Sequence, residues 1–369
     1  MDTAIIRTRL QALREQRQIT QDALAQALGF KDRQTLSAIE LGDRKVTADE
    51  VVQAAHFFKV PVDYFTDPFE LAGEGRFSWR QTNASVKQLD EFEVRAGKWI
   101  AAYRHLSRLK GTPVNSSMRR VALTSKSTFE EAQAEGEAIA WAMKLGPNPA
   151  KKLAHVLEND LDTLVLHVDT FKGISGAACQ LGQLNTILIN RNEAPWRRAF
   201  DLAHELFHLL TWADMAPRHI EGSKPVDAQE KRVETLADNF AGALLMPRPT
   251  IADMIARTPL PAEAQLPKWL VPHAIELAVS ASALRWRLVA LGYLKKAVAD
   301  RISDTSLRMP QSEEAEQPAR FSKRFAEVFA WGIEQGHVSA RRAASLLGIT
   351  LDDLALVFEE HGLKTPFDL

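Results

Sequence analysis

The chain alternates between long segments with apolar residues at helical spacing and a few short segments that are mostly apolar. The segment 196–210 contains no glycine or proline, and its apolar residues form a single stripe: Trp196, Phe200, Ala203, Phe207 and Leu210. This pattern predicts a helix that buries one face. A second amphipathic segment runs over 234–246 and is ended by Pro247. The segments 164–168 and 186–190 are short and rich in Leu, Val and Ile, which predicts buried strands. We therefore expect an α+β fold that is mainly α with a small β-sheet.

The pattern in the first 68 residues predicts five short helices separated by tight turns. Thr20 is a favoured N-cap for a helix over 22–28, and Gly29 is a favoured residue just beyond its end. A second helix, 32–40, follows after a short turn. Two helices joined in this way are typical of a helix-turn-helix unit.

The most specific chemical signal lies inside the predicted helix 196–210. There the motif H-E-x-x-H places His204, Glu205 and His208 together. Residues four apart share one face of a helix, so two imidazoles can approach one divalent metal with a glutamate beside them. The alternative is a pair of partly buried histidines that only support a helix contact. Glu234, expected in the first turn of the second amphipathic helix, would complete a catalytic zinc set with one open position.

The two motifs together resemble those of the ImmA/IrrE family of metallopeptidases. H-E-L-F-H is followed by E-x-x-A-[ND]-x-F-A-x-x-L-L-M-P, with Asp at the [ND] position of this chain. The resemblance implies a zincin-like fold in which His204, His208 and Glu234 bind the metal and Glu205 is the general base. Zinc is the expected ion, and manganese or iron would accept the same ligands.

The same resemblance implies hydrolysis of a peptide bond, with Glu205 taking a proton from water and returning it to the leaving amine. Many family members have Asn where this chain has Asp238, which we interpret as a tolerated change beside the metal ligands. The motifs assign no donor for the oxyanion. His219, in the polar loop between the motifs, is one candidate, and an exposed loop histidine is the alternative.

The segment 20–65 is similar to the Xre (lambda-repressor-like) family of DNA-binding domains. The similarity implies that helix 32–40 enters the major groove of double-stranded DNA. It implies base-edge contacts by Arg33, Gln34, Thr35 and Ser37, and phosphate contacts by Gln21, Arg44 and Lys45. Residues 1–70 hold nine Lys and Arg but eleven Asp and Glu, so the domain has no broad electrostatic attraction to DNA. A docking module for another protein is the alternative.

We expect five consecutive parts in the chain. They are a helix-turn-helix domain at 1–68, a helical connector at 69–130, a zincin-like peptidase domain with a helical extension at 131–300, a flexible linker at 301–320 and a helical module at 321–369. The connector contains an aromatic and basic segment that resembles the linker seen where these two kinds of domain are fused. Its Trp79 would be an interdomain anchor or a stacking partner for nucleic acid.

Composition adds constraints on the environment and partners. The 369 residues carry a net charge of −1 and a single cysteine, Cys179. An internal disulfide is therefore impossible, which fits a reducing cytoplasm. The N-terminus does not resemble a signal peptide, and no apolar run is long enough to span a membrane. We expect a cytoplasmic protein, and because Xre domains often act as pairs on palindromic sites, a homodimer is a further expectation.

Two functions from different classes fit these features. The first is a DNA-associated, zinc-dependent endopeptidase that hydrolyses a peptide bond in a regulatory protein. The resemblance implies a transcriptional repressor as substrate, in a stress or mobile-element response. The second is a helix-turn-helix transcriptional regulator or antitoxin-like protein whose peptidase domain serves sensing or structure. The complete motif set favours the first function, because a domain without catalysis would not need Glu205 for its stability.

Overall fold

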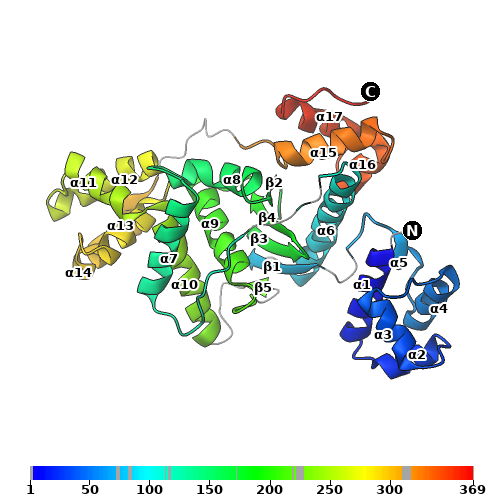
Figure 1. Cartoon of the computed structure of the whole chain (residues 1–369). Helices are drawn as coiled ribbons and strands as arrows, with labels where there is room; N and C mark the ends of the chain where they lie inside the picture. Colours follow the sequence, from blue (N-terminus) through cyan, green and yellow to red (C-terminus); the bar gives the residue numbers. More distant parts are fainter. Residues whose placement is uncertain are drawn as a thin grey trace. The chain divides into compact units, whose positions relative to one another are not determined.

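The computed structural model describes residues 3–71, 75–81, 85–112, 114, 118–171, 173–217, 220–221, 228–309 and 317–368. These residues are mainly helical and contain one mixed five-stranded β-sheet (Figure 1). The expectation of an α+β fold is confirmed. The chain forms two compact units: the first combines Met1–Arg76, Leu89–Val114 and Ala326–Leu369, and the second combines Phe77–Gln88 with Asn115–Phe325.

The N-terminal part of the first unit has the five predicted helices. They are α1 (Thr3–Gln16), α2 (Gln21–Ala27), α3 (Arg33–Leu41), α4 (Ala48–Phe58) and α5 (Asp63–Thr66). The side chain of Thr20 accepts a hydrogen bond from the amide of Ala23 at the start of α2. Gly42 ends α3 with a φ of 93°, a left-handed conformation that favours glycine. All five helices contribute apolar side chains to one core, which fixes the angle between α2 and α3.

The remaining helices of this unit come from distant parts of the chain: α6 (Val86–Leu109), α15 (Lys323–Glu334), α16 (Ala340–Leu347) and α17 (Leu351–Glu360). Trp99 of α6 donates a hydrogen bond from Nε1 to the carbonyl of Leu347, 248 residues away in sequence. Gly332 of α15 lies so close to α6 that a Cβ there would come within 2.9 Å of the Leu106 side chain. The C-terminal helices therefore pack on α6.

The sheet of the second unit has the strand order β2-β4-β3-β1-β5. Its strands are β1 (Arg76–Gln81), β2 (Thr163–Val168), β3 (Ile174–Leu181), β4 (Leu184–Asn190) and β5 (Ile220–Glu221). β2 runs parallel to β4, β3 runs antiparallel to β4, and β1 runs parallel to β5. Strands β2 and β4 are the two that the apolar runs predicted.

The segment that resembled an interdomain linker is strand β1 of this sheet. Trp79 in β1 is fully buried, and its ring stacks on that of Phe77 with centroids 5.4 Å apart. Its side chain is therefore inaccessible to nucleic acid. Residues two apart in a strand lie on the same face, so Phe77 and Trp79 pack together on one face of β1.

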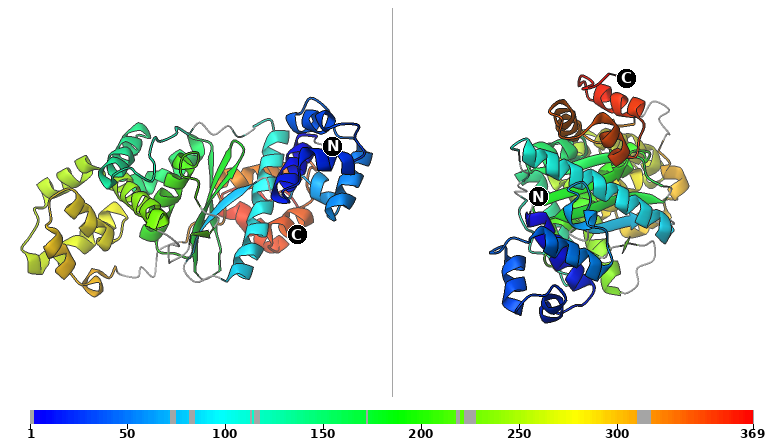
Figure 2. Two further views of the ribbon diagram at one scale, coloured as in Figure 1. Left: turned by 90° about the horizontal axis from the view of Figure 1, so that it is seen from below. Right: turned by 90° about the vertical axis from the view of Figure 1, so that its right-hand side faces the viewer.

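The helices of the second unit are α7 (Phe129–Ala142), α8 (Pro149–Asn159), α9 (Pro195–Thr211), α10 (Ala228–Leu245), α11 (Arg248–Arg257), α12 (Leu266–Leu277), α13 (Ala281–Ala290) and α14 (Lys296–Arg301). Helix α9 lies on β3 and β4, and α10 packs against both α9 and α7 (Figure 2). Gly136 permits this close approach of α7 to α10, because a Cβ there would lie 2.5 Å from the carbonyl oxygen of Phe240.

Part of the segment expected as a flexible linker is packed. A short 3-10 helix, η2 (Asp304–Leu307), places Leu307 in the core of the second unit. Arg285 holds this region by donating hydrogen bonds to the carbonyl of Ile302 and to the carboxylate of Asp304. Within the described ranges, no helix is both long enough and apolar enough to cross a membrane.

Candidate metal centre

Helix α9 holds the three residues of the H-E-x-x-H motif in the interior. It begins at Pro195, which suits the first turn because the missing N–H is not needed there. Every residue from 201 to 211 is buried, since α9 lies between the sheet and α10. His204, Glu205 and His208 are each at most 1% exposed. Ionisable side chains at this depth need partners of opposite charge or a metal ion.

Glu234 of α10 faces both histidines. Its Oε2 atom lies 3.2 Å from Nε2 of His204, and its Oε1 atom lies 3.7 Å from Nε2 of His208. The two Nε2 atoms are 3.1 Å apart. One ligand atom from each residue therefore lies within 4.8 Å of the other two, a spacing that a single ion can bridge. Glu234 lies in the second turn of its helix and not in the first, because α10 already begins at Ala228.

Asp238 orients one of the two imidazoles. It lies one turn after Glu234 on α10, and its Oδ1 atom is 3.0 Å from Nδ1 of His204. A hydrogen bond donated by Nδ1–H to this carboxylate leaves Nε2 directed at Glu234. Carboxylate partners of this kind fix the tautomer and the ring orientation of histidines that bind metals.

The electrostatics of the cluster favour a positive charge between the rings. Burial and the nearby Arg80 both oppose a proton on His204. Hydrogen bonds to the carboxylates of Asp238 and Glu234 outweigh them and raise the pKa of the His204 imidazole to about 10. Burial alone would raise the pKa of Glu234, but the hydrogen bond from His204 and the neighbouring positive charges lower it to about 2. A divalent cation would satisfy the same preference.

Arg80 and Asp201 belong to the cluster but were not found by the sequence analysis. Nη1 of Arg80, on β1, lies 3.4 Å from Oδ1 of Asp201, and Nη2 lies 3.8 Å from Oδ1 of Asp238. Burial opposes the charge of Arg80, but the carboxylates of Asp201 and Asp238, with those of the two motif glutamates, raise its pKa above the ordinary value. Asp201 precedes His204 by three residues and so shares its helix face, a spacing that could have identified it.

Glu205 lies against the central strands of the sheet. A Cβ at Gly176 of β3 would be 3.6 Å from Cγ of Glu205 and 3.0 Å from the carbonyl oxygen of Leu188. Glycine at this strand position therefore avoids a tight contact with the backbone of β4, and the Glu205 side chain lies at an ordinary contact distance from it. His219, the candidate oxyanion donor, lies outside the residues that the structure describes.

The predicted DNA-contacting residues belong to the first unit. Arg33, Gln34, Thr35 and Ser37 lie on α3, Gln21 begins α2, and Arg44 and Lys45 follow α3. Arg33, Gln34 and Lys45 are exposed, whereas Thr35 and Ser37 of α3 are half-buried. The Thr35 amide and hydroxyl both donate to the carboxylate of the N-cap residue Asp32.

Two of the residues predicted to contact phosphates already have partners within the domain. Gln21 donates from Nε2 to Oε2 of Glu40 at 2.6 Å. Arg44 forms an ion pair with Glu50, its Nη2 lying 2.6 Å from Oε1. A phosphate contact by either side chain would have to replace or share these interactions.

Comparison with known proteins gives two family matches. Residues 10–65 match the family described as "Helix-turn-helix", and residues 159–287 match the family described as "IrrE N-terminal-like domain". A segment of 74 residues is 40% identical to the radiation response metalloprotease IrrE of Deinococcus radiodurans. That segment covers 20% of this chain and 23% of the relative. The predicted combination of an Xre-like domain with an IrrE-like, metallopeptidase-type domain is therefore confirmed.

Proposed function

We propose that this chain is a DNA-associated, zinc-dependent endopeptidase that hydrolyses a peptide bond in a regulatory protein. The observation that carries the proposal is the buried cluster of His204, His208 and Glu234, with Glu205 beside it. Two imidazoles and one carboxylate are a donor set that zinc accepts in catalytic sites, and manganese or iron would also fit. The raised pKa of His204 and the lowered pKa of Glu234 support a site that prefers positive charge.

Each residue has a distinct part in this proposal. The two histidines and Glu234 would hold the ion, and Asp238 would keep Nε2 of His204 directed at it. The chemistry supplied by zinc, when bound, is Lewis acidity toward the scissile carbonyl and the attacking water. The carboxylate of Glu205 would accept the proton of that water and return it to the leaving amine. Arg80, whose charge interacts with the carboxylates of Glu205 and Glu234 as well as with those of Asp201 and Asp238, is the candidate to stabilise the negative oxygen that develops in between.

The N-terminal domain supports the association with DNA. Residues 1–68 would bind double-stranded DNA through α3, and residues 131–300 would carry the hydrolysis. The relative from Deinococcus radiodurans is a metalloprotease of the radiation response, which supports a substrate that regulates a stress response, such as a transcriptional repressor. A protein with these partners would act in the cytoplasm, and two copies would fit a palindromic DNA site.

The test is the substitution Glu205→Gln, which keeps the shape of the side chain and removes the base. Full-length wild-type and variant proteins, each loaded with zinc, are incubated with a mixture of synthetic peptides, and the fragments are identified by mass spectrometry. We expect equal zinc content but at least roughly 100-fold slower cleavage by the variant. Glu230→Gln, on α10 near the site, is the matched control and should cleave like the wild type.

Two results would contradict the proposal. Cleavage that persists in Glu205→Gln would remove Glu205 from the mechanism. A wild-type protein that holds zinc but cleaves no peptide would instead favour the regulator or antitoxin-like function, in which this domain serves sensing or structure.

A further inference from the structure

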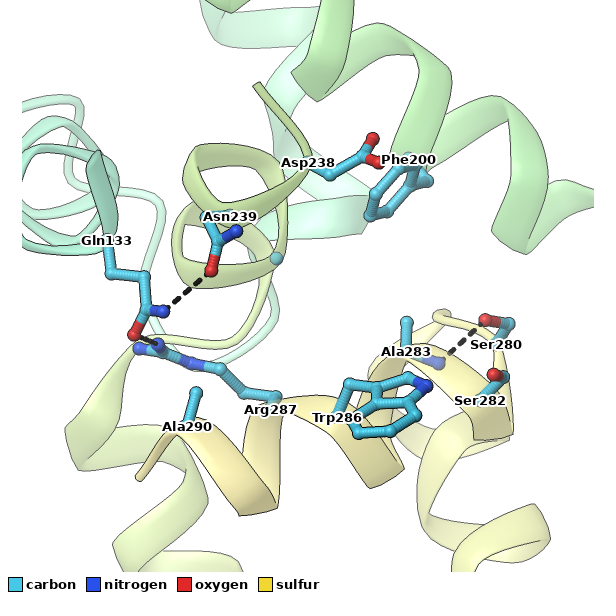
Figure 3. A pocket seen from close by; sticks show the side chains of 11 residues that line it. Gln133, Phe200, Asp238, Asn239, Ser280, Ser282, Ala283, Trp286, Arg287 and Ala290 are labelled. Carbon is cyan, nitrogen blue, oxygen red and sulfur yellow. Dashed lines mark hydrogen bonds between the residues drawn. The ribbon is translucent and has the colours of Figure 1, made fainter. Parts of the chain in front are cut away.

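A pocket of about 340 Å³ has Asp238 in its wall (Figure 3). The carboxylate of Asp238 contacts His204, so the pocket lies beside the candidate metal centre. Residues of α7, α9, α10 and α13 form its walls. Its apolar surface comes mainly from Phe200, Trp286, Ala283, Ala290 and the bare backbone of Gly242. The volume lies within the range of about 300–1,000 Å³ that is usual for ligand pockets.

The pocket begins one helical turn from the candidate metal ligands. Phe200 precedes His204 by four residues on α9, and Asp238 follows Glu234 by four residues on α10. Four helical residues correspond to about 6 Å along the axis. Residues two apart in an extended peptide, whose side chains point to the same side, are separated by a similar distance. A peptide held over the metal centre can therefore direct a side chain close to the cleaved bond into this pocket.

The polar groups in the wall are already engaged with one another. Gln133 donates from Nε2 to Oδ1 of Asn239 at 2.7 Å and accepts from Nη1 of Arg287 at 3.0 Å (Figure 3). Asn239 uses its amide group to donate to the carbonyl of Thr235, and Arg287 also donates to the carbonyl of Met246. A polar side chain entering the pocket would therefore have to compete with these hydrogen bonds, and an apolar one would not.

The hydroxyl groups at the other side of the pocket also form hydrogen bonds within the protein. Ser280 caps α13 and accepts a hydrogen bond from the amide of Ala283, and Ser282 accepts one from Arg285. What remains for contact with a ligand is mainly apolar: the ring of Phe200, the half-exposed ring of Trp286 and small groups between them. The half-exposed carboxylate of Asp238, whose Oδ1 atom faces His204, lies in the same wall. Two aromatic rings around an empty space suit a large apolar side chain.

We propose that this pocket binds a large apolar side chain, aromatic or long aliphatic, at a position of the substrate peptide close to the cleaved bond. This inference rests on the proposed peptidase function and makes the pocket the main determinant of sequence preference. Gly242 is the position where this preference can be changed, because a Cβ added there meets no atom within 4 Å. A large side chain at position 242 would extend into the pocket without disturbing the backbone.

The experiment compares cleavage preferences of zinc-loaded, full-length proteins on a mixture of synthetic peptides that differ only in the residues around one potential cleavage site. We expect wild-type protein to cleave peptides with Phe, Leu or Met at one flanking position roughly 10–200 times faster than those with Gly or Ser there. Gly242→Phe, which fills the pocket, should bring this ratio of cleavage rates close to one. Ala256→Phe, which adds the same ring at an exposed position of α11, should have the same ratio as the wild type.

Trp286→Ala is a second variant, which tests the same claim if Gly242→Phe fails to fold. It removes a half-exposed aromatic ring from the pocket wall, and it should also reduce the ratio between cleavage of the apolar peptides and cleavage of the Gly or Ser peptides. Cleavage by the wild type without preference for apolar residues would overturn the pocket assignment, as would an unchanged ratio in the folded variants. If the zinc-loaded wild type cleaves no peptide at all, the proposed peptidase function fails and this inference fails with it.

Discussion

Oδ1 of Asp238 lies 3.0 Å from Nδ1 of His204, so the imidazole presents its other nitrogen, Nε2, to Glu234 at 3.2 Å. The two acidic residues are one turn apart on α10 and therefore contact opposite nitrogens of the same ring. This geometry means that α10 both supplies a candidate ligand and orients another one on α9.

Replacing Asp238 should weaken metal binding without removing any ligand. We expect Asp238→Ala to lower zinc affinity roughly 10–100-fold, the usual effect of losing the partner that orients a metal-binding histidine. Asp238→Asn keeps an oxygen that can accept from Nδ1–H and should remain closer to the wild type. Competition with a chelator measures both affinities. Equal affinity of the Ala variant and the wild type would show that Asp238 does not orient His204.

Arg80 should be needed for turnover more than for metal binding. Arg80→Ala removes the cation that faces Asp201 and Asp238, and we expect kcat to fall on the order of 100–1,000-fold, as for the loss of an oxyanion donor. Zinc content, measured on the same samples, should stay close to that of the wild type. Arg76→Ala, at an exposed position of the same strand, is the control. Wild-type turnover in Arg80→Ala would exclude a catalytic part for this side chain.

Glu158 should make stability depend on pH, away from the metal centre. Burial raises the pKa of its carboxyl from 4.5 to about 7, despite hydrogen bonds from Ser322 and the amide of Val165. Because the folded pKa is the higher one, protonation stabilises the folded state, and this contribution is lost as pH rises from about 4.5 through 7. Glu158→Gln stays neutral and can still accept from Val165.

The variant Glu158→Gln should therefore gain stability relative to the wild type as pH increases, by up to about 3 kcal/mol above pH 7. Urea unfolding of both proteins at pH 5 and pH 8 measures this difference. A difference between variant and wild type that is the same at both pH values would show that Glu158 ionises equally in folded and unfolded protein.

The exposed Arg33 of α3 should contribute to specific DNA binding. We expect Arg33→Ala to weaken binding to a duplex selected by the wild type by about 1–3 kcal/mol, the usual value of a side chain that reads a base edge. Arg17→Ala, at an exposed position after α1, should bind nearly as tightly as the wild type. Fluorescence anisotropy at fixed salt gives the affinities. Equal binding by Arg33→Ala would remove this residue from the interface.

The residues of the candidate site that the sequence predicted lie on amphipathic helices. His204 and His208 are four apart, and Glu234 lies on a second patterned helix, so local spacing predicts the helix face of each side chain. The helix-turn-helix domain was predictable from its patterned helices, from the N-cap Thr20 and from Gly29 just beyond α2. Asp32, predicted as the first residue of the next helix, is the N-cap of α3.

The features that the sequence did not predict depend on long-range pairing. Strand β3 contains Gly176, Ala177 and Ala178, which have low strand propensity, and it forms because β4 pairs with it. Arg80 reaches α9 only because β1 joins the sheet, more than a hundred residues before α9 in sequence. The packing of α16 on α6 is likewise invisible to local patterns, because Trp99 of α6 donates to the backbone carbonyl of Leu347, a group that every residue carries.

The most direct test of the account is metal content. Wild-type protein, Glu234→Ala and the control Glu230→Ala are purified side by side without added metal and studied by elemental analysis. A single site with three protein ligands predicts about one equivalent of zinc in the wild type and the control, and much less in Glu234→Ala. A wild-type protein that binds no divalent metal, even after reconstitution, would contradict the central claim that His204, His208 and Glu234 form a metal centre.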